Sequence, residues 1–116
     1  MKYLCLIYDE ERTLAAMSKA EVGQFLGEYA NFTKEIKAKG HWLAGNALKP
    51  VASATTVRVR GGKVATTDGP FAETKEQLGG FYLVEARDLN EAIQIAARIP
   101  SARIGSIEVR PIQEFN

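Results

Sequence analysis

A stretch of ionisable residues between positions 68 and 80 is the part of this 116-residue chain best suited to chemistry. It begins with Asp68, which follows a β-rich run, and continues into the alternating charges of Glu73, Lys75 and Glu76. Asp68 can act as a general base, Lys75 can neutralise an anionic ligand, and Glu73 and Glu76 can orient either one. The alternative is that Asp68 only forms a turn and that the charges behind it are solvated. We predict that residues 68–80 form a loop, and loops longer than about 12 residues are often functional, so a catalytic or binding role stays open.

Three aromatic side chains are candidate partners for that chemistry. Tyr29 falls on the apolar face of a helix predicted over residues 18–39, and Tyr8 ends an apolar strand predicted over residues 3–8. A phenol in either place can donate a proton or orient a ligand, or it can pack in the core with its hydroxyl hydrogen-bonded. Phe71, inside the charged stretch, can close a pocket or anchor a protein partner.

The last predicted strand carries a pair of opposite charges. Glu108 and Arg110 lie two residues apart in the run 104–112, so they share one face of that strand. On the inner face of a barrel, Arg110 would hold an anion or form a buried ion pair; on the outer face the two charges would be an ordinary surface pattern. His41 follows Gly40 at the end of the first helix, and we interpret it as structural.

Composition narrows the possible classes of protein. Lys and Arg number 15 against 14 Asp and Glu, a net charge of +1 that argues against direct nucleic-acid binding. One Cys and one His exclude an internal disulfide and a Cys/His zinc cage. The sequence has no phosphate loop or nucleotide fingerprint, so we expect no cofactor. It also has no apolar run near the roughly 20 residues of a membrane span and no signal peptide, so we expect a cytoplasmic protein.

Hydrophobic periodicity and turn signals predict a single α+β domain over residues 1–116. Two capping boxes, at residues 18–21 and 88–91, mark the starts of two amphipathic helices. The predicted strands occupy residues 3–8, 41–45, 55–60, 63–67, 81–86 and 104–112, with Gly61-Gly62 turning a hairpin and a loop over residues 68–80. This order matches the ferredoxin-like, split β-α-β plan with an antiparallel sheet.

Two helices can cover only one face of such a sheet. The opposite face must meet water or a second subunit, and the apolar strands favour a subunit. We therefore expect a homodimer in which two sheets pack face to face.

The stretch Thr67–Glu76, together with Leu78–Tyr82, resembles the signature of the DGPF branch of the YCII-related proteins. The resemblance extends over residues 2–8, 54–60 and 105–111, and so over essentially the whole chain. It implies a dimeric α/β barrel, in which two ferredoxin-like units pack their sheets together.

The resemblance also implies a function. Members of this family are thought to use a His-Asp pair, and a dehydrochlorinase of chlorinated hydroxyquinols looks like a relative. Tyr29 falls where the family has its histidine, and Asp68 is the nearest equivalent of the acidic partner. We therefore expect cofactor-free proton transfer, an elimination or isomerisation of a small hydroxylated or carbonyl compound, with Asp68 as base and Tyr29 as donor or orienter. Lys75 or Arg110 would steady a developing oxyanion in a pocket between the first helix and the 68–80 loop.

Two alternatives remain open at this stage. Relatives occur joined to, or beside, sigma-type transcription factors, so the resemblance also implies a regulatory module that contacts such a factor without catalysis. Phe71 within its charged loop suits a partner surface as well as a pocket. The other alternative is that the whole 68–80 motif is structural, with Asp68 setting a turn and Gly79-Gly80 allowing a strand to pack closely.

Overall fold

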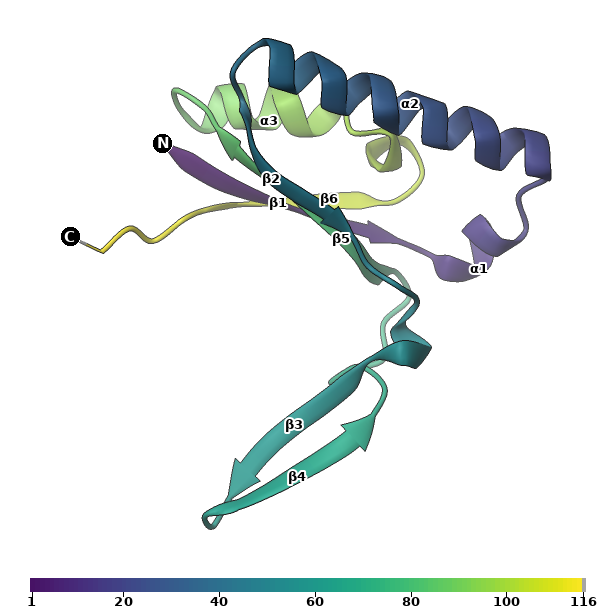
Figure 1. The fold of residues 1–116 in the computed structure, drawn as a ribbon, viewed down its shortest axis with the longest axis vertical. Helices are drawn as coiled ribbons and strands as arrows, with labels where there is room; N and C mark the ends of the chain where they lie inside the picture. Colours follow the sequence, from purple (N-terminus) through teal and green to yellow (C-terminus); the bar gives the residue numbers. More distant parts are fainter. Residues whose placement is uncertain (116) are drawn as a thin grey trace.

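Four antiparallel strands form a sheet that carries all the helices on one face (Figure 1). In this computed structural model, which describes residues 1–115, the strand order is β2-β5-β1-β6. The strands are β1 (Lys2–Asp9), β2 (Trp42–Ala47), β5 (Gln77–Glu85) and β6 (Ser106–Pro111). The helices are α1 (Glu11–Ala15), α2 (Lys19–Ala38) and α3 (Leu89–Ala97), with short 3₁₀ turns at Val51–Ser53 and Pro100–Arg103. The predicted α+β, ferredoxin-like class is confirmed.

Strand β1 runs through the middle of the core. Its odd-numbered side chains Tyr3, Cys5 and Ile7 are buried beneath the helices, while Leu4 and Leu6 on the other face are half-buried. The same alternation places Asp9, the last residue of the strand, on the helix-covered face. A carboxylate is thereby carried into the interior at the end of an apolar strand.

Helix α2 begins and ends where the sequence predicts. The hydroxyl of Ser18 accepts a bond of 3.1 Å from the backbone N–H of Glu21, and the Glu21 carboxylate accepts one of 2.9 Å in return. At its other end, the N–H of His41 bonds to the carbonyl of Ile36 at 2.9 Å. Phe32 and Ile36 bury the inner face of the helix against the sheet.

Part of the predicted 68–80 loop is strand. Residues 77–80 belong to β5 and pair with β1, with a bulge where Ile7 pairs with Gly80 and Tyr8 with Leu78. Gly79 and Gly80 favoured a loop in the sequence, but the structure gives another reason for the glycine at position 80. A Cβ there would lie 2.9 Å from the carbonyl oxygen of Asn46 on β2. The glycine lets two strands approach, as the structural alternative held. The five-residue helix α1 was not predicted.

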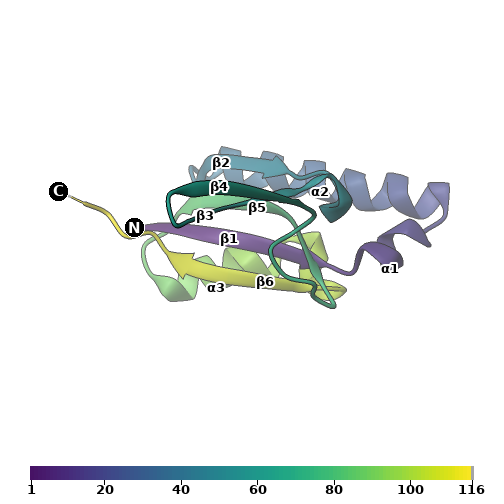
Figure 2. The same ribbon diagram turned by 90° about the horizontal axis from the view of Figure 1, so that it is seen from below.

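The hairpin β3 (Thr55–Arg60) and β4 (Lys63–Asp68) forms a separate two-stranded sheet, which we call the arm. It is inserted between β2 and β5 and stands off the side of the main sheet opposite the helices, as two perpendicular views agree (Figures 1 and 2). The molecule measures 48 × 47 × 19 Å, which reflects the extended arm.

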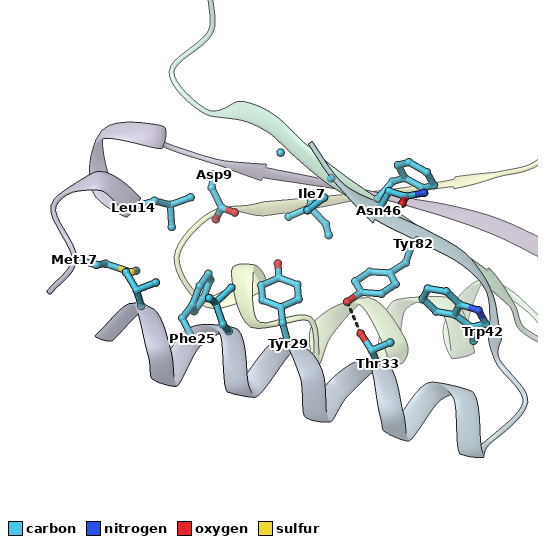
Figure 3. Close-up of a pocket in the computed structure, with 17 residues that line it drawn as sticks. Ile7, Asp9, Leu14, Met17, Phe25, Tyr29, Thr33, Trp42, Asn46 and Tyr82 are labelled. Carbon is cyan, nitrogen blue, oxygen red and sulfur yellow. Dashed lines mark hydrogen bonds between the residues drawn. The ribbon is translucent and has the colours of Figure 1, made fainter. Parts of the chain in front are cut away.

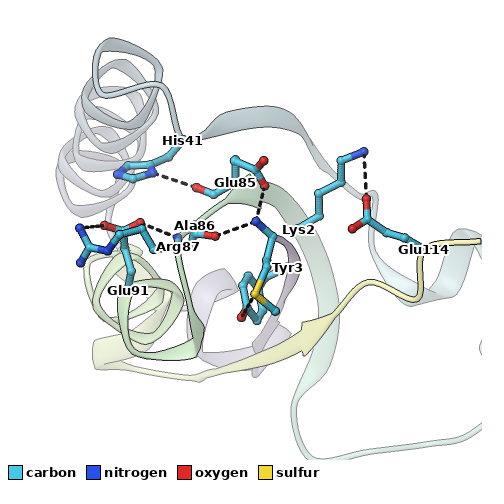
Figure 4. A network of polar contacts seen from close by, with 9 residues as sticks. Lys2, Tyr3, His41, Glu85, Ala86, Arg87, Glu91 and Glu114 are labelled. Carbon is cyan, nitrogen blue, oxygen red and sulfur yellow. Dashed lines mark hydrogen bonds and ion pairs between the residues drawn. The ribbon is translucent and has the colours of Figure 1, made fainter.

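Polar contacts tie the ends of β1, β2 and β5 together far from the arm (Figure 4). The terminal ammonium of Met1 donates to the carbonyl of Ala86 at 2.9 Å and pairs with the Glu85 carboxylate at 3.1 Å. The Nδ1 atom of His41 lies 2.8 Å from the carbonyl oxygen of Glu85. This position agrees with the interpretation of His41 as structural.

Candidate functional site

A cavity of about 570 Å³ lies between α1, α2 and the helix-covered face of the sheet (Figure 3). We call it the Tyr29 cavity. Its lining is mainly apolar and aromatic: Ile7, Asp9, Leu14, Met17, Val22, Phe25, Leu26, Tyr29, Thr33, Trp42, Gly45, Asn46, Ala47, Gly79, Gly80, Phe81 and Tyr82. A space of this size and character suits a small organic ligand.

Three hydrogen-bonded side chains link Asp9 and Tyr29, which both line the cavity, through Ser101. The Tyr29 hydroxyl lies 2.6 Å from the Oγ of Ser101, and this Oγ donates to the Oδ2 of Asp9 at 2.7 Å. Ser101 has a single proton, which it gives to Asp9, so Tyr29 must be the donor in the other bond. Figure 3 shows the Asp9 carboxylate and the Tyr29 hydroxyl pointing toward the same space from β1 and α2. The three groups can pass a proton along this chain.

Asp9 has one oxygen with no partner. The residue is only 7% exposed, and its Oδ1 is the single buried side-chain nitrogen or oxygen within residues 1–115 that lacks a hydrogen bond. Burial raises the pKa of Asp9; the hydrogen bond from Ser101 opposes this shift, and the negative charge of Glu76 adds to it. A buried acceptor left unsatisfied is costly, which makes Asp9 a candidate functional residue.

Tyr29 keeps its proton at neutral pH. Burial raises the pKa of Tyr29 to about 12, a shift that the bond to Ser101 opposes and the nearby charge of Asp9 increases. The side chain is therefore a hydrogen-bond donor or proton donor, not a base. Its ring packs edge-on against Phe25, with centroids 5.3 Å apart, which fixes its position in the cavity.

A second pair of hydroxyls lies along the cavity wall. Thr33 Oγ1 and the Tyr82 hydroxyl are 2.7 Å apart, and burial raises the pKa of Tyr82 as well. The Tyr82 ring is nearly parallel to that of Tyr29, at 6.5 Å between centroids, and packs edge-on against Trp42. These rings give the cavity flat aromatic walls.

Helix α1 closes one end of the cavity and is held there from the base of the arm. The N–H of Glu11 donates to Oε1 of Gln77 at 2.8 Å, and the Oε2 of Glu11 accepts from the N–H of Val51 at 2.9 Å. Because Leu14 and Met17 follow in this segment and line the cavity, the two bonds fix the position of that wall.

The residues predicted to form the site do not converge within one chain. Tyr29 lines the cavity, but Asp68 is the last residue of β4, exposed on the arm, and does not line it. The expected pairing of Tyr29 with Asp68 in one chain is therefore wrong, because the hairpin carries Asp68 away from the helix-covered face. Of the 68–80 stretch, only Gly79 and Gly80 reach the cavity.

The other candidates lie in three places. Tyr8 and Phe71 line a second cavity of about 580 Å³ between the arm base and the main sheet. Glu73 and Lys75 are exposed, Lys75 beside a shallow hollow near α1. Arg110 lies exposed on the open sheet face, ion-paired with Glu108 on the same strand.

Asp9 and Ser101 are the residues that sequence reasoning missed. Asp9 had a signal: the period-two pattern of Tyr3, Cys5 and Ile7 continues to it, one residue beyond the predicted strand. Ser101 had no such signal, because it lies in the 3₁₀ turn that begins at Pro100, and the sequence does not reveal the path of that turn. Within residues 1–115, no cluster of three or more His, Cys, Asp or Glu side chains is arranged to hold a metal ion. Over the same residues, no helix has the length and apolar character needed to cross a membrane.

Comparison with known proteins assigns the family. The model for the YCII-related domain matches residues 1–116. The chain belongs to the YCII-related family. Another member, the uncharacterized protein R00369 of Rhizobium meliloti (strain 1021), is 37% identical over 114 residues, which cover 97% of this chain and 92% of that protein.

A solved structure with the same fold is that of an enzyme. It is the 5-chloro-2-hydroxyhydroquinone dehydrochlorinase (TftG) from Burkholderia phenoliruptrix AC1100 in complex with 2,5-dihydroxybenzoquinone. The match has a TM-score of 0.57 at 14% sequence identity and covers 99% of this chain and 96% of that one. At this identity the match establishes a common fold for this YCII-related chain.

Proposed function

We propose that this YCII-related protein binds a small hydroxylated aromatic or carbonyl compound in the Tyr29 cavity and acts on it as a cofactor-free acid/base enzyme of the lyase or isomerase type. The observation that carries the proposal is the buried, unpartnered Oδ1 of Asp9, joined through Ser101 to the hydroxyl of Tyr29. A carboxylate and a phenol linked in this way form an acid/base pair inside an apolar cavity.

The cavity favours an uncharged ligand with a ring and a hydroxyl group. Its walls are aromatic, and its lining contains the carboxylate of Asp9 but no Lys or Arg. An anionic ligand would face the buried charge of Asp9 without a cation to offset it. A neutral phenol can instead donate its O–H to Oδ1 and stack its ring on the walls. The substrate of the dehydrochlorinase, as its name describes it, is a compound of this kind.

The three linked side chains can complete a proton circuit on such a ligand. Asp9 takes the proton of a ligand hydroxyl, and the electron pair of the broken O–H bond forms a C=O bond. The displaced ring electrons form a C–H bond with the proton of Tyr29. Tyr29 then regains a proton from Ser101, and Ser101 takes the proton that Asp9 received. The net change is conversion of an enol to its keto form. If that ring carbon also carries a leaving group, its departure as an anion with loss of a second hydroxyl proton completes an elimination.

The test is ligand binding and turnover with a variant of Tyr29, at one end of these linked side chains. A thermal-shift screen of neutral phenols is expected to stabilise the wild type, since saturation at about 100 times the Kd adds roughly 2.7 kcal/mol. For a phenol that binds, Tyr29→Phe should retain binding and lose turnover by about 100-fold or more. Tyr82→Phe is the matched control, because it removes a cavity hydroxyl that is not bonded to Asp9, Ser101 or Tyr29, and it should keep most activity. Equal loss in both variants would contradict the assignment.

Protein recognition is a second candidate function. Phe71 is 81% exposed in a loop of alternating charges, which suits an anchor for a partner such as a sigma-type transcription factor. Purified sigma factor should then bind the wild type and lose affinity at least tenfold with Phe71→Ala. Unchanged binding would remove Phe71 from that role.

A further inference from the structure

The Tyr29 cavity extends well beyond the side chains that the proposed reaction uses. Figure 3 shows Leu14 and Met17 at one end of it and Trp42 at the other. Asp9 and Tyr29 lie between these two ends. The cavity measures about 570 Å³, whereas an apolar cavity of about 150 Å³ is large enough to hold benzene. A ligand that consists of one hydroxylated ring would therefore leave most of this space unfilled.

The end of the cavity near α1 is aliphatic, and we call it the aliphatic lobe. Its side chains come from α1, from the turn after α1 and from the first half of α2: Leu14, Met17, Val22 and Leu26. None of the four can donate a hydrogen bond, and the sulfur of Met17 is only a weak acceptor. Methionine also adapts its shape to irregular apolar neighbours. The lobe therefore has the chemistry of a site for an alkyl group.

Helix α2 presents more apolar surface to this lobe than the protein covers. Val22, Leu26 and Tyr29 follow one another at helical spacing, so they form one apolar stripe that leads from the lobe to Tyr29. The buried residues of α2, Phe32 and Ile36, lie farther along the helix, whereas Val22 is 37% and Leu26 62% exposed. The start of α2 extends past the end of the sheet toward α1 (Figures 1 and 2). The sheet that covers the later turns of α2 thus does not cover the start of the stripe.

Helix α1 leaves its apolar side chains incompletely covered as well. It has five residues, which is too short to be stable by itself, and none of them is buried. The two bonds of Glu11 fix its beginning, and Leu14 and Met17 are half-buried along the lobe. An apolar group in the lobe would pack against α1 and α2 at once, and would cover side chains that both helices leave exposed.

We propose that the substrate is a hydroxylated aromatic compound that carries an alkyl chain, and that the aliphatic lobe binds this alkyl chain. The inference rests on the proposed function, because the ring of the same ligand lies beside Asp9 and Tyr29. From there the alkyl chain extends along the stripe on α2 and packs beneath α1. Leu26, at the middle of the stripe, is then a residue that determines the preference for the alkyl chain.

The test is the affinity of two probes, 5-methylresorcinol and 5-pentylresorcinol, measured by isothermal titration calorimetry. They share one ring and its hydroxyls and differ by four CH₂ groups. Each fully buried CH₂ tightens binding about fourfold, so a pentyl group half-buried in the open lobe should bind at least about tenfold more tightly than the methyl group. Equal affinities would overturn the alkyl-chain proposal and leave the proposed function standing. Failure of both probes to bind would overturn the two together.

Leu26→Gln tests where the alkyl chain lies. Because Leu26 is mostly exposed, the variant should fold, and it should bind 5-methylresorcinol within about twofold of wild type. The advantage of the pentyl compound should fall by at least about threefold. Leu89→Gln is the matched control, because Leu89 is 49% exposed on α3 and lies outside the cavity lining, and it should keep the full advantage. An advantage that survives in Leu26→Gln, or that falls equally in both variants, would overturn the proposal.

Discussion

Replacing Ser101 with Ala tests the chain of hydrogen bonds at its centre. The side chain is fully buried, and its Oγ is bonded to both Tyr29 and Asp9. Removing it leaves both oxygens of a buried carboxylate without a partner. A bond to a charged group contributes about 1.5–3 kcal/mol and one between neutral groups about 0.5–1.5 kcal/mol, so the expected loss is about 2–4.5 kcal/mol. For a chain of 116 residues the unfolding entropy near Tm is about 240 cal/mol/K, so Tm should fall by about 8–19 °C.

The loss should also depend on pH. The bond from Ser101 lowers the pKa of Asp9, so its removal raises that pKa further above the unfolded value. A carboxyl group with a raised folded pKa loses its contribution to stability as the pH rises through that pKa. The Tm difference between variant and wild type should therefore be smallest below the unfolded pKa of about 4 and grow toward neutral pH.

Thermal unfolding of Ser101→Ala at several pH values, followed by circular dichroism or calorimetry, measures both effects. Ser106→Ala is the matched control, because it removes a 2.7 Å bond from a serine hydroxyl to the carboxylate of Glu76, but at an exposed position. That control should change stability by less than about 0.5 kcal/mol. A Tm for Ser101→Ala within about 2 °C of wild type, or a difference independent of pH, would refute the reasoning.

Three further variants test the surroundings of this centre. Asp9→Asn removes a buried carboxylate whose folded pKa is raised by burial. Tm should therefore rise at neutral pH and stay unchanged in acid, while turnover is lost. A lower Tm at neutral pH would contradict this. Gly105→Ala would bring a Cβ within 2.1 Å of the Tyr8 carbonyl oxygen and 2.7 Å of Asp9 Oδ1, and should cost more than about 2 kcal/mol by denaturant unfolding, whereas Gly79→Ala, which meets nothing within 4 Å, should cost little. Glu11→Ala releases the α1 wall and should weaken phenol binding by calorimetry, whereas Glu11→Gln, which keeps an acceptor, should bind within about threefold of wild type; equal weakening would contradict the role of that bond.

The sequence predicted the elements whose signals are local. The capping box at Ser18 and the periodic apolar residues of α2 identified that helix to within a residue, and Gly61-Gly62 identified the turn of the arm. The order of these elements was enough for the ferredoxin-like plan. The start of β5 was missed because Gly79 and Gly80 have no side chains to show alternation, and the reason for a glycine at position 80 lies in a neighbouring strand.

The candidate site was harder to predict because it is assembled from distant segments. Asp9 and Ser101 are 92 positions apart, and their contact depends on β1 lying beside the 3₁₀ turn after α3. Tyr29 was found because a helical face could be drawn for it. Asp68 was predicted from its motif, but that motif lies at the base of the arm. The position of the Asp68 carboxylate depends on the path of the hairpin, which the motif does not reveal.

A crystal structure of the protein soaked with a neutral phenol such as resorcinol tests the central claim most directly. The account predicts the ring between the aromatic walls of the Tyr29 cavity, with one hydroxyl oxygen within about 2.6–3.2 Å of the Oδ1 of Asp9. Phenol bound beside Phe71 in the second cavity, with nothing next to Asp9, would contradict it.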